Sequence, residues 1–174
     1  WQEHKYRERE RLLAADRLKK GGRSCFFADA QLAEKSGISG GTAIATLPHI
    51  GHSPPLALRS SVLADGRVLL RQMHGCIPGG LLCACVYLPV GRGNKGKDDH
   101  LKVLHQLGRF FAAFNRPFLV GGDWNCSPAD QADLGLPARL QATVVQGGDA
   151  TCFTPMGRGA VHGVLGFFLL SDVL

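Results

Sequence analysis

The stretch that decides the fold is 117-PFLVGGDWNCSP-128, in which an apolar run leads through two glycines into an acid, an indole and an amide. Its first five residues predict a buried strand, and its Ser-Pro pair predicts a turn. Because alternate residues of a strand point the same way, we expect Asp123 and Asn125 to share one side, with Trp124 on the other. The glycines would leave room for another backbone or for a ligand.

One carboxylate beside one amide suits chemistry on a phosphate group. The Asp123 carboxylate can orient or deprotonate a water molecule, and the Asn125 amide can donate a hydrogen bond to a phosphate oxygen as charge builds. The alternative is an Asx turn that simply ends a strand, with Trp124 in the core. The spacing alone leaves both interpretations open.

The composition is that of a folded protein with unevenly distributed charge. The 174 residues are 45% hydrophobic and 20% charged, which excludes a disordered tail and suits one domain. The net charge is +6 and the pI is about 9.2. Residues 1–23 hold eight basic and four acidic side chains, whereas residues 117–174 hold two arginines and five aspartates. This asymmetry fits an anionic substrate beside a metal site, and a solvated basic helix is the alternative for the first segment.

The six cysteines indicate a reduced protein rather than a zinc site. None of them forms a C-x-x-C pair, and Cys83 and Cys85 alternate within an apolar run as small core residues do. We therefore expect an intracellular protein, nuclear or cytoplasmic. No apolar run approaches the roughly 20 residues that span a membrane, and no signal peptide pattern is present, so we expect no membrane partner.

Turn residues and apolar spacing predict an α/β protein. A regular βαβ repeat and a GxGxxG motif are both lacking, which disfavours a dinucleotide-binding fold. Residues 129–142 contain many turn residues and remain unassigned. Helices are predicted over 4–20 and from Asp98 or Asp99 to Asn115, strands over 24–28, 39–47, 81–90, 117–121, 143–145, 151–153 and 164–170, and a hairpin over 58–74.

The segment Gly122-Asp123-Trp124-Asn125, after an apolar strand and before a Ser-Pro turn, resembles the GD-x-N motif of the endonuclease/exonuclease/phosphatase superfamily. That superfamily includes deoxyribonuclease I, the abasic-site endonucleases and the endonuclease domains of non-LTR retrotransposons. Further segments resemble other motifs of the family and follow the family's order, and their residues are most similar to those of the retroelement type. These segments are Gln2-Glu3, SGGTAI at 39–44, Val86-Tyr87-Leu88-Pro89, Thr151-Cys152-Phe153 and 164–171.

The resemblance implies a four-layer α/β/β/α sandwich of two mostly antiparallel sheets. Residues 1–174 would form a single domain of this type, incomplete because the family's first strand and its final strand and loop have no counterpart in them. The family's first-strand asparagine would lie before Trp1 and its terminal Asp-His pair beyond Leu174. We expect this chain as given to be inactive or very weak.

The resemblance also implies the site residues, cofactor and partner. Glu3 would bind Mg²⁺, with Mn²⁺ as a substitute, Asp123 would position or activate water, and Asn125 and Tyr87 would steady the phosphoryl oxygens. The partner would be DNA, and the protein would be a monomer. Read without the resemblance, Glu3 is a solvent-exposed acid at a helix start and Tyr87 is a core aromatic residue. The basic loop residues expected to contact a nucleic-acid backbone, unless they are merely solvated, are Arg92, Lys95 and Lys97.

One position departs from the family pattern. The closing strand normally carries an aspartate that supports the catalytic histidine, and Gly166 stands in its place. Three functions therefore remain open. They are a DNA endonuclease domain of retroelement type, a phosphatase or phosphodiesterase acting on a small or lipid phosphate, and a catalytically degenerate remnant.

Overall fold

The computed structural model describes residues 5–32, 38–55, 62–63, 66–88, 93–114, 116–146, 152–156, 159–163 and 166–172. The helices are α1 (Glu8–Lys20), α2 (Gly93–Phe114), α3 (Pro128–Asp133) and α4 (Leu136–Leu140). The first strands are β1 (Ser24–Ala28), β2 (Gln31–Leu32), β3 (Ile38–Ser39), β4 (Thr42–Thr46), β5 (His52–Ser53), β6 (Val62–Leu63) and β7 (Val68–Met73). The remaining strands are β8 (Leu81–Tyr87), β9 (Phe118–Asp123), β10 (Ala142–Val145), β11 (Cys152–Met156), β12 (Gly159–Gly163) and β13 (Gly166–Ser171).

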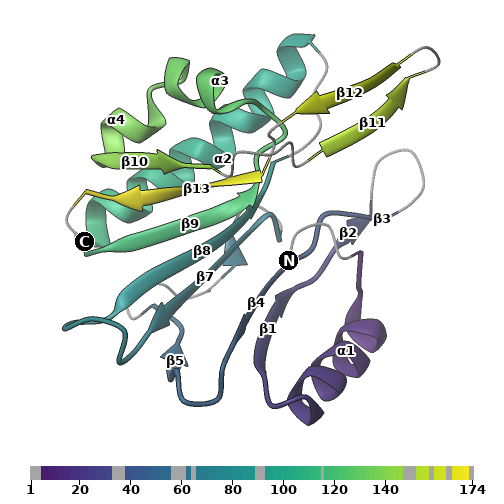
Figure 1. Cartoon of the computed structure of the whole chain (residues 1–174), viewed down its shortest axis with the longest axis vertical. Coiled ribbons are helices and arrows are strands. Elements are labelled where there is room, and N and C mark those ends of the chain that lie inside the picture. Colours follow the sequence, from purple (N-terminus) through teal and green to yellow (C-terminus); the bar gives the residue numbers. More distant parts are fainter. Residues whose placement is uncertain are drawn as a thin grey trace.

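A seven-stranded sheet organises the molecule. Its strand order is β10-β13-β9-β8-β7-β5, and β6 pairs with β7 at one edge. Every pair is antiparallel except β8 and β9, which run parallel and are joined through α2. A parallel pair needs such a crossover connection, because a tight hairpin can only join antiparallel strands. Figure 1 shows α2, α3 and α4 on one side of this sheet.

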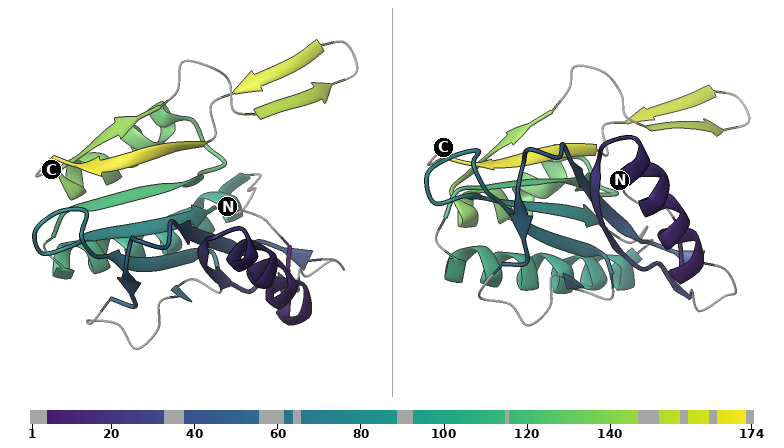
Figure 2. Two further views of the ribbon diagram at one scale, coloured as in Figure 1. Left: turned by 60° about the horizontal axis from the view of Figure 1, so that its bottom comes forward. Right: turned by 90° about the horizontal axis from the view of Figure 1, so that it is seen from below.

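A second sheet and the first helix complete the layers. Strands β1 and β4 form an antiparallel pair, β4 packs against β7 and β8, and α1 packs against β1. The order of layers is therefore α1, the β1–β4 sheet, the seven-stranded sheet and the helices α2 to α4 (Figure 1). This arrangement confirms the predicted four-layer sandwich. The short β11–β12 ribbon projects away from both sheets (Figure 2).

The pleat decides which core each side chain enters. On β8 and β9, even-numbered residues such as Val86 and Val120 point toward the helices and are fully buried in the main core. Odd-numbered residues point the other way, where Cys85 joins Leu69 and Ala28 in a smaller core between the sheets. Alternation of this kind follows from the two-residue period of a strand. The side chain of Asp123 therefore belongs to the inter-sheet face.

The two glycines before Asp123 serve close packing inside the sheet. A Cβ at Gly122 would overlap the carbonyl oxygen of Val86 on the neighbouring strand, and a Cβ at Gly121 would overlap the ring of Phe168. The room that the sequence predicts for another backbone is thus occupied by β8. The ring of Phe168, which remains 49% exposed, fills the space beside the other glycine.

Several element boundaries differ from the prediction. Helix α2 begins at Gly93, five residues before the predicted start at Asp98. A helix that has started gains one hydrogen bond for each residue added, so it can extend through residues without apolar spacing. The unassigned segment 129–142 contains all of α4 and all of α3 except its first residue, Pro128. The hairpin predicted over 58–74 is confirmed by the pairing of β6 with β7, and β12 was not predicted. Among the described residues, no helix is both long and apolar enough to span a membrane.

Candidate functional site

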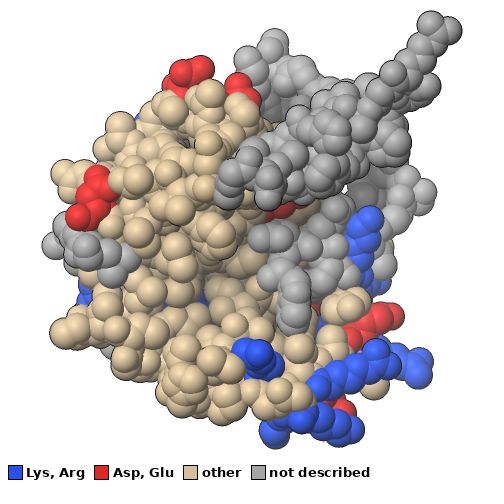
Figure 3. Space-filling model, viewed as in Figure 1, with Lys and Arg blue, Asp and Glu red and all other residues tan. Residues whose placement is uncertain are grey.

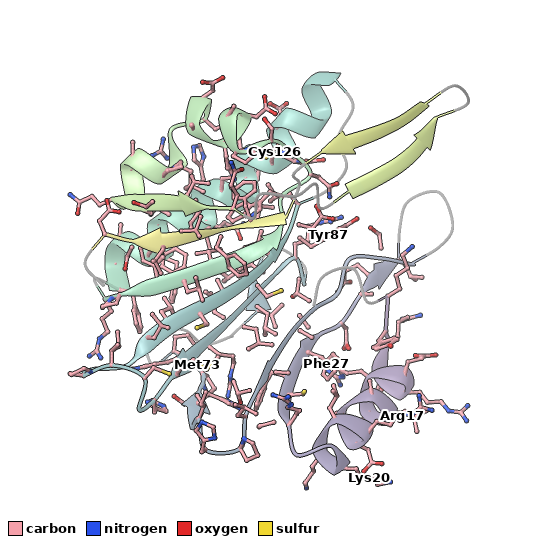
Figure 4. The ribbon with its side chains drawn as sticks, in the orientation of Figure 1. Arg17, Lys20, Phe27, Met73, Tyr87 and Cys126 are labelled. Atoms are coloured by element: carbon pink, nitrogen blue, oxygen red, sulfur yellow. The ribbon has the colours of Figure 1, made fainter. Side chains whose placement is uncertain are left out.

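Four neighbouring strands bring Arg67, Tyr87, Asp123 and Gly166 into one row across the large sheet. The backbone N–H of Tyr87 donates to the carbonyl oxygen of Arg67 at 2.8 Å. Tyr87 pairs with Asp123 across the parallel β8–β9 ladder, and Asp123 pairs with Gly166 across the β9–β13 ladder. Residues paired directly opposite each other point to the same face of a sheet. We call these four residues the candidate row; Figure 4 labels Tyr87 at this end of the strands and Met73 at the other.

A tight turn after β9 joins the acid to the amide. Strand β9 ends at Asp123, and Asn125 adopts a left-handed backbone with φ +46°. Its backbone N–H donates to Asp123 Oδ1 at 3.1 Å, which is the Asx turn that the sequence left as an alternative. The expectation that Asn125 shares a strand face with Asp123 is therefore wrong, because the strand has already ended. The turn, rather than the pleat, places the two side chains together.

The Asn125 side chain is anchored to the neighbouring strand. Its Nδ2 donates a hydrogen bond to the carbonyl oxygen of Leu88 at 2.6 Å, and the Leu88 N–H donates to the carbonyl oxygen of Asp123 at 2.9 Å. An amide nitrogen carries two hydrogens, so one donor is used for anchoring and a second is left to point elsewhere. The amide is thus held in a fixed orientation beside the acid.

The buried position of Trp124 confirms the prediction that its side chain points away from the side of Asp123. Its indole is fully buried, stacks on Phe167 with ring centroids 5.1 Å apart, and donates its Nε1–H to the Phe167 carbonyl oxygen at 2.9 Å. A buried indole normally needs such a partner for its N–H. Trp124, which lies between Asp123 and Asn125, therefore anchors the turn to β13 through the main core.

Arg67 is a site residue that the sequence did not single out. Its guanidinium carbon lies 5.5 Å from the centroid of the Tyr87 ring, and its buried Nη1 has no hydrogen-bond partner among the described residues. In the sequence, Arg67 is marked only by its place after the predicted Asp65-Gly66 turn. The pairing of β7 with β8 is what shows that it lies opposite Tyr87.

The glycine turn of the SGGTAI segment lies against the same tyrosine. Gly40 and Gly41 have φ values of +78° and +86°, which residues with a side chain rarely adopt. A Cβ at Gly40 would lie 3.8 Å from Cδ1 of Tyr87, whose side chain is only 3% exposed. The carbonyl oxygen of Gly40 accepts the backbone N–H of Lys5 at 3.3 Å. The start of the described chain is therefore tied to this end of the sheet.

Cys126, next to the amide, is not a reactive thiol. Burial raises its pKa to about 11, and the negative charges of Asp130 and Asp123 contribute to the same rise. A thiol with so high a pKa stays protonated near neutral pH, whereas nucleophiles and metal ligands are thiolates. The chemistry of the site therefore belongs to oxygen and nitrogen groups.

The side chains of the other predicted site residues are not described by the structure. Glu3 and Arg92 lie outside the described residues, and Lys95 and Lys97 belong to the first turns of α2, where side chains are not described. Within the described part of the chain, no three His, Cys, Asp or Glu side chains gather as a metal-binding group. Asp123 is thus the carboxylate that the described row itself supplies.

Comparisons with known proteins identify the fold. No family model and no curated protein matches the chain. The endonuclease domain of TRAS1, a telomere-specific non-LTR retrotransposon, superposes with a TM-score of 0.62 at 12% identity over 94% of this chain and 79% of that one. D. rerio TDP2 complexed with a single-strand DNA product gives a TM-score of 0.60 at 13% identity over 99% of this chain and 70% of that one.

A third solved structure agrees with these two. The human Nocturnin catalytic domain with a bound sulfate anion gives a TM-score of 0.57 at 15% identity over 90% of this chain, which spans 63% of that domain's length. All three have the deoxyribonuclease I-like fold of the endonuclease/exonuclease/phosphatase proteins, and the chain has this fold as well. At these identities the likeness establishes the architecture alone.

Proposed function

We propose that this chain, with its deoxyribonuclease I-like fold, carries the site of a phosphodiester hydrolase whose substrate is DNA, of the retroelement endonuclease type. The observation that carries the proposal is the candidate row, in which Asp123 lies directly opposite Tyr87, with Arg67 beyond it. Asn125 follows Asp123 in the turn, and its side chain is anchored to Leu88, the residue after Tyr87. Hydrogen-bond donors near one carboxylate suit a reaction in which water attacks an anionic substrate.

Each residue has a role that its chemistry allows. Arg67 offers its guanidinium N–H groups to phosphate oxygens, which a guanidinium matches well in shape and charge. Asn125 donates its second amide hydrogen to an oxygen that gains charge during the reaction. Asp123 accepts a hydrogen from the attacking water and so orients it. Tyr87, packed between Arg67 and the Gly40 turn, holds the arginine in place.

A divalent metal ion fits the oxygen-donor chemistry of the proposed site. Mg²⁺ prefers oxygen ligands and binds through one or two carboxylates with several waters, and Mn²⁺ can replace it. Glu3 is the proposed ligand. When bound, the ion would polarise a phosphate oxygen and stabilise the leaving oxygen.

Charge favours a polyanionic substrate over a small phosphate ester. The net charge is +6, and the last turn of α1 carries Arg17, Lys19 and Lys20. Figure 3 shows Lys and Arg side chains gathered over α1. A basic surface of this kind supplies affinity for phosphate backbones that falls steeply as salt rises. The names of two structural neighbours, an endonuclease domain and a complex with a DNA product, support the same substrate class.

Gly166 favours a second candidate, a nucleic-acid-binding protein that no longer cleaves. It pairs directly with Asp123, at the place where the family resemblance implies a supporting aspartate. A glycine supplies no carboxylate to this end of β13. This candidate predicts DNA binding with a strong salt dependence and no metal-dependent turnover.

Nicking of supercoiled plasmid separates the two candidates. The protein, with its natural flanking sequence in one arm and as residues 1–174 in another, is incubated with Mg²⁺ or with EDTA. The hydrolase proposal predicts nicked circles in the flanked arm with Mg²⁺ alone. Retention of the plasmid on a gel at low salt without any nicking, by a protein shown to be folded, would contradict it and support the second candidate.

A further inference from the structure

A pocket of about 570 Å³ lies at the opposite end of β9 from the candidate row. It is an open pocket between the end of α2, the start of β9 and the end of α4, and its lining includes Phe111, Phe118 and Leu140. Phe118 starts β9 and Asp123 ends it, and five strand residues span about 16 Å. This pocket is therefore separate from the site that we assign to phosphodiester hydrolysis.

The floor of the pocket is apolar and its rim is cationic. Phe111, Phe118 and Leu140 line it and are 4%, 5% and 8% exposed, so these apolar side chains are fixed in the core and show only their edges to the pocket. Arg116 and Arg139 are exposed and line the same pocket, and no acidic side chain of the described residues lines it. A pocket with an apolar body and a few convergent polar groups is the usual form of a small-molecule site.

Arg116 is held in place at the rim. Its Nη1 donates to the carbonyl oxygen of Gly79, and its guanidinium carbon lies 5.8 Å from the centroid of the Phe114 ring. A guanidinium carries five N–H donors, so four remain for a ligand. Because the side chain is already fixed, binding an anion there would cost little additional ordering.

Two further donors face the same space. Arg139, in the last turn of α4, has no carboxylate partner among the residues that the structure describes. Ser171 lines the pocket at 4% exposure, and its Oγ accepts the Phe118 N–H at 3.1 Å, which leaves the hydroxyl hydrogen to donate. The adjacent carboxylate of Asp172 is engaged, because its Oδ1 accepts from Thr143 Oγ1 at 2.7 Å.

We propose that this pocket binds a small amphipathic anion. Its carboxylate or phosphate head would accept hydrogen bonds from Arg116, Arg139 and Ser171, and its aliphatic or aromatic body would lie on the apolar floor. An uncharged ligand would leave the guanidinium groups without an anion, and a simple inorganic anion would leave the floor exposed to water. The two features together select a molecule that has both parts.

Titration calorimetry with decanoate tests the proposal. Decanoate has both parts, decanol has the same body without charge, and acetate has the head without the body. Two variants are compared with the unmodified chain: Arg139→Gln removes one rim charge, and Arg109→Gln removes an exposed charge from α2 that does not line the pocket. We expect decanoate to bind at least about tenfold more weakly to Arg139→Gln and equally well to Arg109→Gln. Acetate and decanol should bind much more weakly than decanoate.

The amide NMR spectrum of the same samples locates the ligand. Decanoate should shift the backbone amides of Phe118, Gln141 and Ser171 and leave those of Asp123 and Asn125 unchanged. Equal affinity of the two arginine variants, equal affinity for decanol and decanoate, or shifts centred on the exposed Phe168 would each overturn the proposal. Both substitutions are at exposed positions, so an unchanged thermal unfolding midpoint confirms that any loss of binding is local.

Discussion

Asp123 accepts the backbone N–H of Asn125 through its Oδ1 at 3.1 Å, and this hydrogen bond closes the turn between the acid and the residue that carries the amide of the proposed site. The bond requires Asn125 to hold a left-handed backbone, with φ +46°, immediately after the strand ends. Asparagine tolerates this conformation better than most residues with a side chain. The same residue therefore satisfies the turn and supplies the donor.

Replacing Asn125 separates these two contributions. Asn125→Gly allows the left-handed backbone and loses the hydrogen bond to Leu88, so it should cost about 1 kcal/mol of stability, whereas Asn125→Ala also strains the backbone and should cost about 1–2 kcal/mol more. Both variants lose the amide, so both should lose Mg²⁺-dependent plasmid nicking. Gln141→Gly is the matched control, because Gln141 has φ +51° at the far end of the sheet. Full nicking by Asn125→Gly would remove the amide from the proposed mechanism.

Gly122 should tolerate no side chain. Gly122→Ala would force a Cβ into the carbonyl oxygen of Val86, and we expect a loss of about 3 kcal/mol or more in the free energy of unfolding. Gly108→Ala on α2 is the control. Its new Cβ would lie 3.8 Å from Leu136 Cδ1, an ordinary contact, and alanine favours a helix by about 0.5–1 kcal/mol. Urea unfolding measures both variants, and equal midpoints would contradict the close packing of β9 against β8.

Two adjacent phenylalanines test which face of β13 is buried. Phe167 is 1% exposed beneath Trp124, so Phe167→Ala should destabilise the fold by about 3–5 kcal/mol. Phe168 points to the other face and is 49% exposed, so Phe168→Ala should cost about 1–1.5 kcal/mol. Chemical denaturation gives both values. A reversed order of the two losses would mean that the register of β13 is shifted by one residue.

His52 should make the stability of the fold depend on pH. Its Nδ1 lies 3.1 Å from Arg71 Nη2, and its Nε2 lies 2.9 Å from Ser24 Oγ. A guanidinium can only donate, so Nδ1 accepts and the neutral ring donates its Nε2–H to the serine. Burial lowers the pKa of His52, and the charges of Arg71 and His74 lower it further.

The sign of this pH dependence follows from where the proton binds. Between the lowered folded pKa and the unfolded value near 6.5, the unfolded chain binds the extra proton, so stability rises with pH in that window. It is fully present above about 6.5 and is lost as the pH falls through the folded pKa. Thermal midpoints from pH 5 to 8 should fall on acidification more for the unmodified chain than for His52→Gln. His49→Gln, at an exposed position, should behave like the unmodified chain, and identical acid profiles for all three would refute the assignment.

The sequence predicts the parts of this fold that carry strong apolar patterns. Strand β1 matches the predicted range 24–28, and β8, β9 and β13 lie within two residues of their predicted starts, because each is an apolar run with turn residues beside it. Helices α3 and α4 were missed because they are too short to show apolar periodicity. Local capping defines α3 instead, through the reciprocal hydrogen bonds of Ser127 and Asp130.

The candidate site was likewise predictable from the sequence only in part. Tyr87, Asp123 and Asn125 were predicted from motifs, and the β8–β9 register places the first two directly opposite each other. Arg67 could not be predicted, because its place in the row depends on the pairing of β7 with β8 rather than on any local motif. The roles of these residues, the metal ligand Glu3 and the single-domain boundary of 1–174 stay predictions.

The paired comparison of Asp123→Ala with Asp172→Ala tests the central claim most directly. Both remove one aspartate, but Asp123 lies in the candidate row and Asp172 is exposed at the other end of β13, bonded to Thr143. In the protein with its natural flanking sequence, we predict that Asp123→Ala lowers the rate of Mg²⁺-dependent plasmid nicking by at least about a thousandfold and that Asp172→Ala leaves it unchanged. Equal nicking by two folded variants would contradict the assignment of the row as the hydrolytic site.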